Sequence, residues 1–337
     1  MTSDQQDLTQ PKDLIIQPSK GLVSIPEGGS SALSEIINRS LVHIQASNAL
    51  ADSDPQISDE QLVATTDNVK RNDMVDKVKN LIHVPSSKTK TIVIPRPGDE
   101  REFEIDQGVK IVMCWIPPGR FLMGSPENEV GRSKNETQHL VEITQGFWLA
   151  KTLTTQAQWQ AVMGNNPSHF KGGDLPVERV SWNDICGDET RTGGFLEAIN
   201  WISTSDGCFH LPTEAQWEYA CRAGTTGPHY GNLDEIAWYN ANSGIMTHPV
   251  ALKKRNNWGL HDMLGNVYEW CSDWLGPYPL GFEADPCGAV LGSYRVIRGG
   301  SWAGLKSNYW RVAERGCFTP SNAEYHVGFR LARRLIL

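Results

Sequence analysis

The sequence predicts an α+β domain, rich in loops and built from short helices and short strands, which follows a polar N-terminal region. Three observations lead to this prediction. From about Lys110 onward the chain is rich in Trp, Gly and Pro, its strand-like apolar runs are short, and its helix signals are short and capped. All 12 Trp and all 8 Tyr lie after position 114, so the large side chains that dominate core burial are confined to this part of the chain.

Residues 1–105 form the predicted polar N-terminal region. Phe103 is the only aromatic residue before residue 110, and the polar stretches are typical of linkers. Apolar residues recur at helical spacing in two places and predict two amphipathic helices: Leu33, Ile36, Ile37, Leu41 and Ile44, and then Met74, Val75, Val78, Leu81 and Ile82. Such a pair cannot form a core alone, so we expect it to dock on the downstream domain, on a partner, or on a second copy in self-association.

Residues 106–337 form the predicted domain. Its first elements are a strand over 111–116, a turn at Pro117-Pro118-Gly119, and a strand over 120–123. Further strands are expected over 294–298 and 327–332.

Two helices of this domain begin with the same pattern, Thr-X-Ala-Gln-Trp. Thr155 and Gln158 form a capping-box pattern, and Gly164 is placed for a left-handed stop. Thr213 and Gln216 repeat the pattern, with a glycine at 224. The repetition fits two capped helices that each bury a Trp, and it also fits an internal duplication, for which five residues are little support.

Charge, hydropathy and cysteine content argue against several classes of protein. A net charge of −8 gives no electrostatic reason to bind nucleic acid or an acidic membrane. The polar N-terminus and the lack of a run of 18 apolar residues predict no membrane span and no signal peptide, so we expect a cytoplasmic protein. Seven irregularly spaced cysteines are too sparse for a disulfide scaffold, and free thiols are expected.

Seven sequence blocks between about 110 and 334 carry a family resemblance. They are Phe121-Leu122-Met123-Gly124-Ser125, Asn166-Pro167-Ser168-His169-Phe170, Pro176-Val177-Glu178-Arg179-Val180-Ser181-Trp182, Leu211-Pro212-Thr213-Glu214-Ala215-Gln216-Trp217-Glu218-Tyr219-Ala220, Gly259-Leu260-His261-Asp262-Met263-Leu264-Gly265-Asn266-Val267-Tyr268-Glu269-Trp270, Arg298-Gly299-Gly300-Ser301-Trp302 and Gly328-Phe329-Arg330. In this order they resemble the sulfatase-modifying-factor family, whose type member is the formylglycine-generating enzyme. The resemblance implies an α+β fold related to the C-type lectins, on which unrelated functions occur, so function must be argued from the site.

The catalytic members of this family bind copper through two cysteines that follow the Gly-Gly-Ser-aromatic block. Thiolate pairs select Cu(I), so the chemistry needs sulfur at both positions. Gly304 and Tyr309 stand at these positions here, and the nearest sulfur, Cys317, is alone. We therefore expect no copper. A sulfoxide-forming branch that uses non-haem iron is also not favoured, because His43 and His83 do not form its His-X-X-X-His spacing.

The resemblance also implies a structural calcium ion. By this resemblance the ion is held by the side chains of Asp262 and Glu269 and by the backbone carbonyls of Gly265 and Val267. Oxygen ligands of this kind suit calcium, which would cross-link loops. The alternative is that the two carboxylates only cap and solvate a turn.

The segment between about Arg298 and Val327 is the predicted ligand-binding region, 299–327. It shows no apolar period over roughly 28 residues, and loops this long inside a domain are usually functional or disordered. The family blocks at both of its ends favour order. Aromatic residues among small Gly, Ala and Ser suit recognition, because rigid aromatic anchors make contacts at low entropic cost. The candidate ligand-binding residues are Trp302, Ala303, Gly304, Leu305, Ser307, Asn308, Tyr309, Trp310, Gly316, Cys317, Phe318, Ser321, Ala323, Tyr325 and His326.

A subset of the family comprises the variable proteins of diversity-generating retroelements, in which adenines of Asn codons are randomised. Apart from the two tryptophans, every candidate in this set is reachable from an Asn codon by changing adenines alone. Lys306, Glu314 and Glu324 are not, so these three must be encoded by the template if the region is diversified. The region is basic overall, but we interpret Arg298 and Arg330 as internal hydrogen-bonding anchors.

These observations favour a non-catalytic ligand-binding protein that displays a recognition surface to a protein or peptide. The alternative is a copper-dependent formylglycine-generating oxidase that acts on a substrate cysteine.

Overall fold

The structure of this 337-residue chain is a computed structural model, and it describes residues 15–17, 22–26, 89–106, 108–188, 193–203, 208–304 and 310–334. Contacts divide the chain into two compact units, residues 1–94 with Leu337, and residues 95–336. In the first unit, strands β1 (Ile15–Gln17), β2 (Leu22–Pro26) and β3 (Thr89–Val93) form an antiparallel sheet in the order β1-β2-β3. No pattern in the sequence predicted this sheet, and the two helices predicted for this region lie outside the described residues.

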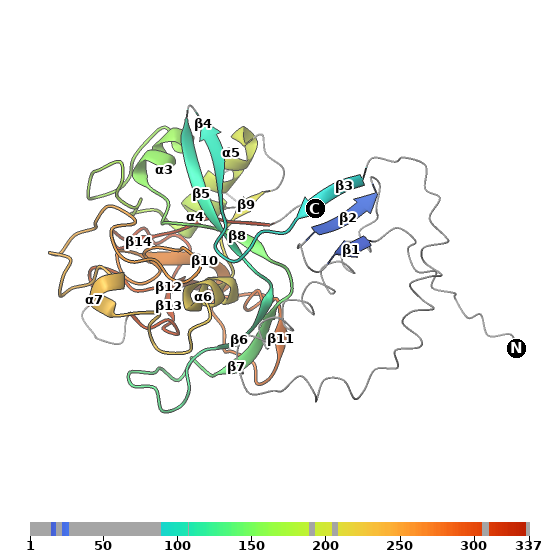
Figure 1. Ribbon diagram of the computed structural model, residues 1–337. Coiled ribbons are helices and arrows are strands. Elements are labelled where there is room, and N and C mark those ends of the chain that lie inside the picture. Colours follow the sequence, from blue (N-terminus) through green and yellow to red (C-terminus); the bar gives the residue numbers. More distant parts are fainter. Residues whose placement is uncertain are drawn as a thin grey trace, which may run out of the picture. The chain divides into compact units, whose positions relative to one another are not determined.

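The second unit is built on a five-stranded sheet in the order β4-β5-β8-β15-β9 (Figure 1). Its strands are β4 (Glu100–Asp106), β5 (Val109–Ile116), β8 (Phe147–Ala150), β9 (Phe209–His210) and β15 (Ala332–Arg334). The apolar run of β5 forms an interior strand between β4 and β8, and its second half and all of β8 are buried. β4 pairs with β5 and places Phe103 in the core, so the unit begins at Pro95, earlier than the composition indicates.

Two smaller sheets complete the strands of this unit. The first has the order β13-β12-β10-β14 and comprises β10 (Tyr268–Trp274), β12 (Arg295–Arg298), β13 (Gly316–Phe318) and β14 (Val327–Gly328). The second has the order β11-β7-β6 and comprises β6 (Gly119–Met123), β7 (His139–Ile143) and β11 (Glu283–Ala284).

The strand predicted over 327–332 is two strands in two different sheets, and the prediction of one strand is wrong. β14 pairs with β10, and β15 pairs with β8 and β9. The chain changes sheets at Arg330, whose guanidinium is bound to Glu269 of β10 and to the carbonyl of Ala150 in β8.

The five helices of the described part are short: α3 (Gln156–Met163), α4 (Trp182–Cys186), α5 (Phe195–Ile202), α6 (Glu214–Arg222) and α7 (Leu233–Ile236). Both predicted capping boxes are confirmed, at Thr155 and at Thr213. Gly164 ends α3 at a φ of 71°, whereas α6 ends at Ala223 with a φ of 43°, one residue before the predicted glycine.

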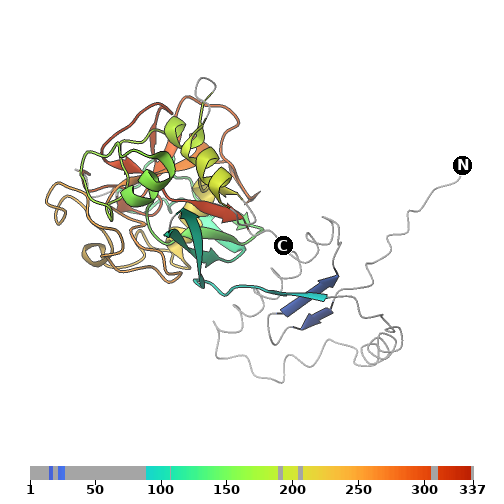
Figure 2. The same ribbon diagram turned by 90° about the horizontal axis from the view of Figure 1, so that it is seen from above.

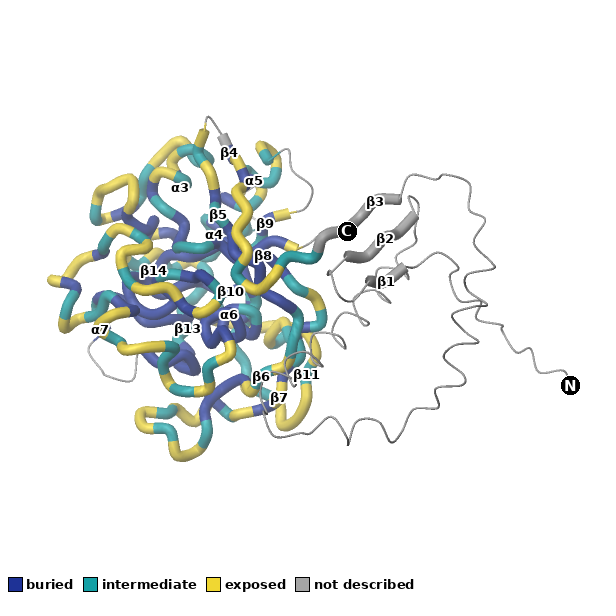
Figure 3. Tube along the Cα trace, viewed as in Figure 1, coloured by how far each residue is buried: buried dark blue, intermediate teal, exposed yellow. Residues whose placement is uncertain are grey.

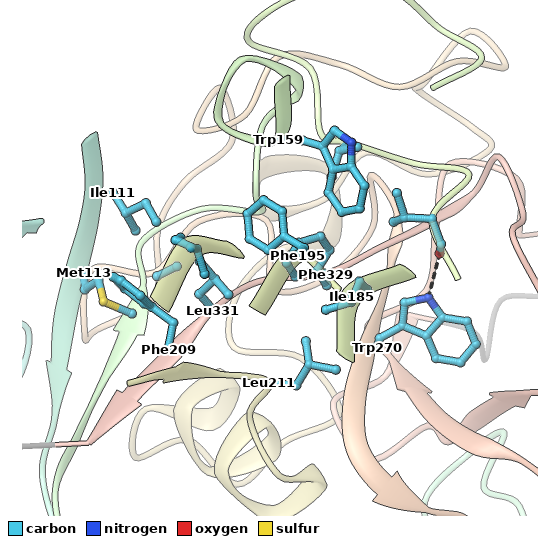
Figure 4. Packing of buried hydrophobic residues seen from close by; sticks show 14 of the residues in the cluster. Ile111, Met113, Trp159, Ile185, Phe195, Phe209, Leu211, Trp270, Phe329 and Leu331 are labelled. Atoms are coloured by element: carbon cyan, nitrogen blue, oxygen red, sulfur yellow. Dashed lines mark hydrogen bonds between the residues drawn. The ribbon is translucent and has the colours of Figure 1, made fainter. Parts of the chain in front are cut away.

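The core of the second unit lies between the sheets and the helices. α5 packs against both α3 and α4, and Figure 2 shows these helices, coloured green to yellow, beside one another. Figure 3 shows the buried segments running through the centre of the unit. In one of the two large clusters Trp159 stacks on Phe195 at 5.0 Å, and the indole of Trp270 donates to the carbonyl of Val180 at 3.0 Å (Figure 4). Both tryptophans of the repeated pattern, Trp159 and Trp217, are buried.

These elements give the predicted α+β architecture of short strands, short helices and long connections. Within the described ranges, no helix is long and apolar enough to cross a membrane.

Candidate functional site

Residues 319–326 form a loop whose backbone is held from two sides. Backbone amides of the segment 179–183 donate to it, from Asn183 to the carbonyl of Pro320 and from Arg179 to the carbonyl of Glu324, each at 3.1 Å. At its end, Tyr268 of β10 donates to the carbonyl of His326 at 2.9 Å. Hydrogen bonds that fix the main chain in this way leave the side chains to do the binding.

Side-chain exposure alternates along this loop. Ser321, Ala323 and Tyr325 are exposed, with Tyr325 at 45%, and the residues between them are half-buried. All three exposed residues belong to the predicted candidates. The two residues between them, Asn322 and Glu324, are not candidates, and the carbonyl of Glu324 accepts hydrogen bonds from the amides of Arg179 and Val327.

Tyr325 is part of a group of rings that we call the aromatic surface, made of His169, Phe170, Trp302, Phe318, Tyr325 and His326. Ring centroids lie 5.6 Å apart for Tyr325 and Trp302, and 6.0 Å apart for Tyr325 and His169. Phe170 meets Trp302 edge-on at 5.6 Å, and Phe318 lies 5.9 Å from His326. Such contacts restrict the motion of each ring.

His169 and Phe170 come from a segment that the sequence analysis did not include in the site. They lie in the block Asn166-Pro167-Ser168-His169-Phe170, which was visible as a family motif, and this motif was the available signal. The carboxylate of Glu178 accepts from the amide of Phe170 at 2.8 Å and so holds the segment. Burial raises the pKa of Glu178 to about 7.

The other candidates differ in accessibility. Trp302 and Trp310 are buried, and the Trp310 indole donates to the carbonyl of Ser301 at 3.0 Å. Ala303 is half-buried, and Gly304 is buried. Gly316, Cys317 and Phe318 form strand β13 on β12 and are half-buried, whereas a loop was expected here. Four candidates lie outside the described residues: Leu305, Ser307, Asn308 and Tyr309.

Residues 311–315, in the middle of the predicted region, belong to the interior. Arg298 donates to the carbonyls of Val312 at 3.0 Å and of Ala313 at 2.9 Å, and it also pairs with the carbonyl of Glu314 and with Glu218. This confirms Arg298 as an internal anchor, and the Arg330–Glu269 pair does the same for Arg330. Burial raises the pKa of Glu314 to about 8, and its side chain belongs to the scaffold.

Neither of the two positions that resemble the family's copper-binding pair carries a cysteine in this chain. All seven cysteines are free thiols. Burial raises the pKa of Cys317, and it raises those of Cys114 and Cys186 to about 11 and about 12, so the thiolate that copper requires is disfavoured at each. Gly304 carries no sulfur, and Tyr309 lies outside the described residues.

The four predicted calcium ligands do not fit one ion as they stand. Asp262 is buried and its Oδ1 atom has no hydrogen-bond partner, so it could serve as a ligand. Glu269, however, receives Arg330 on both oxygens, at 2.6 and 2.8 Å, and the indole of Trp217 at 3.0 Å. A divalent cation on Glu269 would lie against the buried guanidinium of Arg330. Gly265 and Val267 lie between these residues and offer only their carbonyls. Within the described ranges, no three His, Cys, Asp or Glu side chains are grouped so as to hold a metal.

Comparisons with known proteins agree with this architecture. Residues 104–335, more than half of the chain, match the sulfatase-modifying factor enzyme 1-like domain. The chain belongs to this family. Among solved structures it is similar to Treponema denticola variable protein 1, with a TM-score of 0.60 and 32% identity over 70% of this chain and 99% of that one. It is also similar to PvdO from Pseudomonas aeruginosa, with a TM-score of 0.61 and 25% identity over 72% of this chain and 100% of that one.

Curated relatives have different names and lengths. The formylglycine-generating enzyme of Streptomyces coelicolor is 34% identical over 52% of this chain and 58% of its own length. The serine/threonine-protein kinase pkn1 of Chlamydia caviae is 42% identical over 72% of this chain and 41% of its own length. The matches thus span about two fifths to three fifths of the length of these two relatives. The resemblance to this family and the predicted lectin-like α+β fold are confirmed.

Proposed function

We propose that this chain is a non-catalytic ligand-binding member of the sulfatase-modifying-factor family, which recognises a protein or peptide through residues 319–326 and the aromatic surface. The observation that carries the proposal is the loop whose backbone is fixed by residues 179–183 while Ser321, Ala323 and Tyr325 project outward. A fixed main chain lowers the entropy lost on binding, and an exposed tyrosine among small residues provides an anchor.

The pattern of burial supports diversification of this surface as a finer form of the proposal. Glu314, which Asn-codon randomisation cannot produce, is buried in the scaffold. Ser321, Ala323 and Tyr325, which it can produce, are exposed. The similarity to a variable protein of Treponema denticola points the same way. A genomic template repeat of the codons for about 295–335, beside a reverse-transcriptase gene, would support this form, and its absence would leave ligand binding without diversification.

Two exposed tyrosines provide a matched test of the surface. We would select binders from a phage-displayed random peptide library against the folded chain and measure the affinity of the selected peptides for two variants. Tyr325→Ala should weaken binding at least about tenfold, because exposed aromatic anchors dominate such contacts. Tyr294→Ala removes a tyrosine of similar exposure, 49% against 45%, that is not part of the aromatic surface, and it should have no effect. Equal affinities of the two variants, or peptides that bind only elsewhere, would contradict the proposal.

The oxidase remains the competing function, because the formylglycine-generating enzymes share about a third of their residues with this chain over the matched region. Incubation of the copper-loaded protein with a cysteine-containing substrate peptide decides between the two. Our proposal expects no conversion of cysteine to formylglycine by mass spectrometry, and turnover would overturn it.

For residues 1–94 we propose self-association or partner docking through the predicted helices around 33–44 and 74–82. Light scattering of the full chain and of a variant with Ile37→Asp and Leu41→Asp tests the first option. A particle of one chain's mass before substitution would exclude self-association.

A further inference from the structure

The domain also contains a cavity whose lining residues are not part of the loop 319–326 or of the aromatic surface. It encloses about 230 Å³ between β7, β10, β11 and the turns around 276–279 and 286–289. A methionine, a tyrosine and three prolines form much of its wall. The polar lining residues are His139, Glu214, Asp273, Glu283, Cys287 and Arg315. The volume suits a side-chain end or a small molecule, since drug-sized ligands occupy roughly 300 Å³ or more.

The cation in the wall of this cavity is already fully engaged. Arg315 binds both carboxylate oxygens of Glu214, each at 2.7 Å, and donates to the carbonyls of Asn135 and Gly276, each at 3.0 Å. The Tyr278 hydroxyl donates to Glu214 at 3.0 Å. Arg315 and Glu214 therefore neutralise each other and leave little to offer a ligand.

His139 presents an acceptor on the inner wall. Its side chain is 1% exposed, and its Nδ1 lies 3.0 Å from the carbonyl of Thr137, which assigns the ring proton to Nδ1. Nε2 of the neutral ring then carries a lone pair, and it has no hydrogen-bond partner. Oε2 of Glu283 lies 3.6 Å from this Nε2 atom. Two acceptors this close to each other can both be satisfied by one donor group of a ligand that approaches them from the cavity.

Asp273 adds a third acceptor. It is buried, and its Oδ2 accepts from the amide of Glu214 and from the hydroxyl of Ser272, each at 2.9 Å. Burial and the charge of Glu214 raise the pKa of Asp273 to about 7, so a cation nearby would favour its charged form.

We propose that this cavity binds a primary ammonium group, carried by a small free amine or by a lysine side chain of a peptide. The atoms that the hydrogen bonds above leave open are Nε2 of His139, the carboxylate of Glu283 and Oδ1 of Asp273, and all of them are acceptors, which excludes an anion and favours a donor. An ammonium has three donors on a compact centre, matching the three acceptors of His139, Glu283 and Asp273. A guanidinium, whose N–H donors all lie in one plane, would need two of these acceptors in that plane.

Cys287 can report on the cavity while Cys208 serves as a control in the same molecule. Both thiols are exposed, but only Cys287 lines the cavity. We would measure the iodoacetamide labelling rate of each cysteine by mass spectrometry, with 1,4-diaminobutane or Nα-acetyl-lysine amide as ligand. Neutral 1,4-butanediol and the Nε-acetylated lysine derivative serve as matched controls. The ammonium ligands should slow labelling of Cys287 at least about threefold and leave Cys208 unchanged.

Glu283→Gln then tests the site itself. Glu283 is partly exposed, so the variant should fold, and it should weaken calorimetric binding of the protecting amine at least about tenfold. Glu142→Gln is the control, because Glu142 pairs with Ala284 across the same sheet and its side chain binds Arg120. Protection by only one of the two ammonium ligands identifies the source. Protection by the neutral ligands as well, no protection by either amine, or equal binding by both variants would overturn the proposal.

Discussion

Arg298 offers the sharpest test of how the scaffold holds the recognition region. Its side chain and that of Glu218 are both fully buried, and its guanidinium also binds the carbonyls of residues 312–314. Arg298→Met removes the donor to Oε2 of the buried Glu218 and the donor to these carbonyls, whereas Oε1 of Glu218 keeps its bond to Arg222 at 2.8 Å. Breaking a buried pair from one side costs about 3–5 kcal/mol, which in a domain of this size lowers the Tm by roughly 6–20 °C.

Arg120→Met is the matched control for this measurement. Arg120 pairs with Glu142 at 3.1 Å but is 60% exposed, so its loss should cost no more than about 1 kcal/mol. Urea and thermal unfolding followed by circular dichroism give both values. Arg298→Lys, which keeps the charge but not the fork, should fall between them and provides a folded sample if the Met variant does not accumulate. A cost for Arg298→Met within 1 kcal/mol of the control would refute the reasoning.

Three further predictions concern a carboxylate, a glycine and a metal. Because burial raises the pKa of Glu178 from 4.5 to about 7, its contribution to stability is complete below about pH 4.5 and is lost as the pH rises through 7. Glu178→Gln should flatten the pH dependence of the unfolding free energy over this window by an order of 1–3 kcal/mol, and an unchanged slope would contradict it. Gly265 and Gly164 both have positive φ, 79° and 71°, but only a Cβ at 265 would meet backbone, 2.3 Å from the carbonyl oxygen of Trp238. Gly164→Ala should cost about 1 kcal/mol and Gly265→Ala several times more in urea unfolding, whereas equal costs would remove the steric argument. Because Arg330 already satisfies Glu269, the Tm should be the same in calcium and in chelator, and a rise of several degrees with calcium would restore the metal.

Elements that depend on residues close together in the chain could be predicted from the sequence. The capping boxes at Thr155 and Thr213 need only residues three positions apart, and both formed. The strand over 111–116 carries an apolar run that fits the centre of a sheet, and it became β5.

Strand pairing and side-chain contacts between residues far apart in the chain could not be predicted from the sequence. Gly316, Cys317 and Phe318 have no apolar period, and they form a strand because β12 offers its edge to them. His169 and Phe170 join the aromatic surface across more than 130 residues of sequence, through contacts that no spacing rule encodes. Trp310 belongs to the predicted binding region but packs inward, because large rings near a glycine-rich turn fill the core as readily as they line a site. Trp302 is also buried, and it joins the aromatic surface through its ring contacts with Phe170 and Tyr325.

The sharing of residues 327–334 between two sheets bears on synthesis at the ribosome. β15 lies between β8 and β9, and among the described strands β9 pairs with β15 alone. A nascent chain that ends before residue 332 therefore exposes the edge of β8 and the whole of β9, however much of the preceding 230 residues has been translated. We expect cotranslational folding of this domain to be completed in one late step, with chaperones most needed just before it.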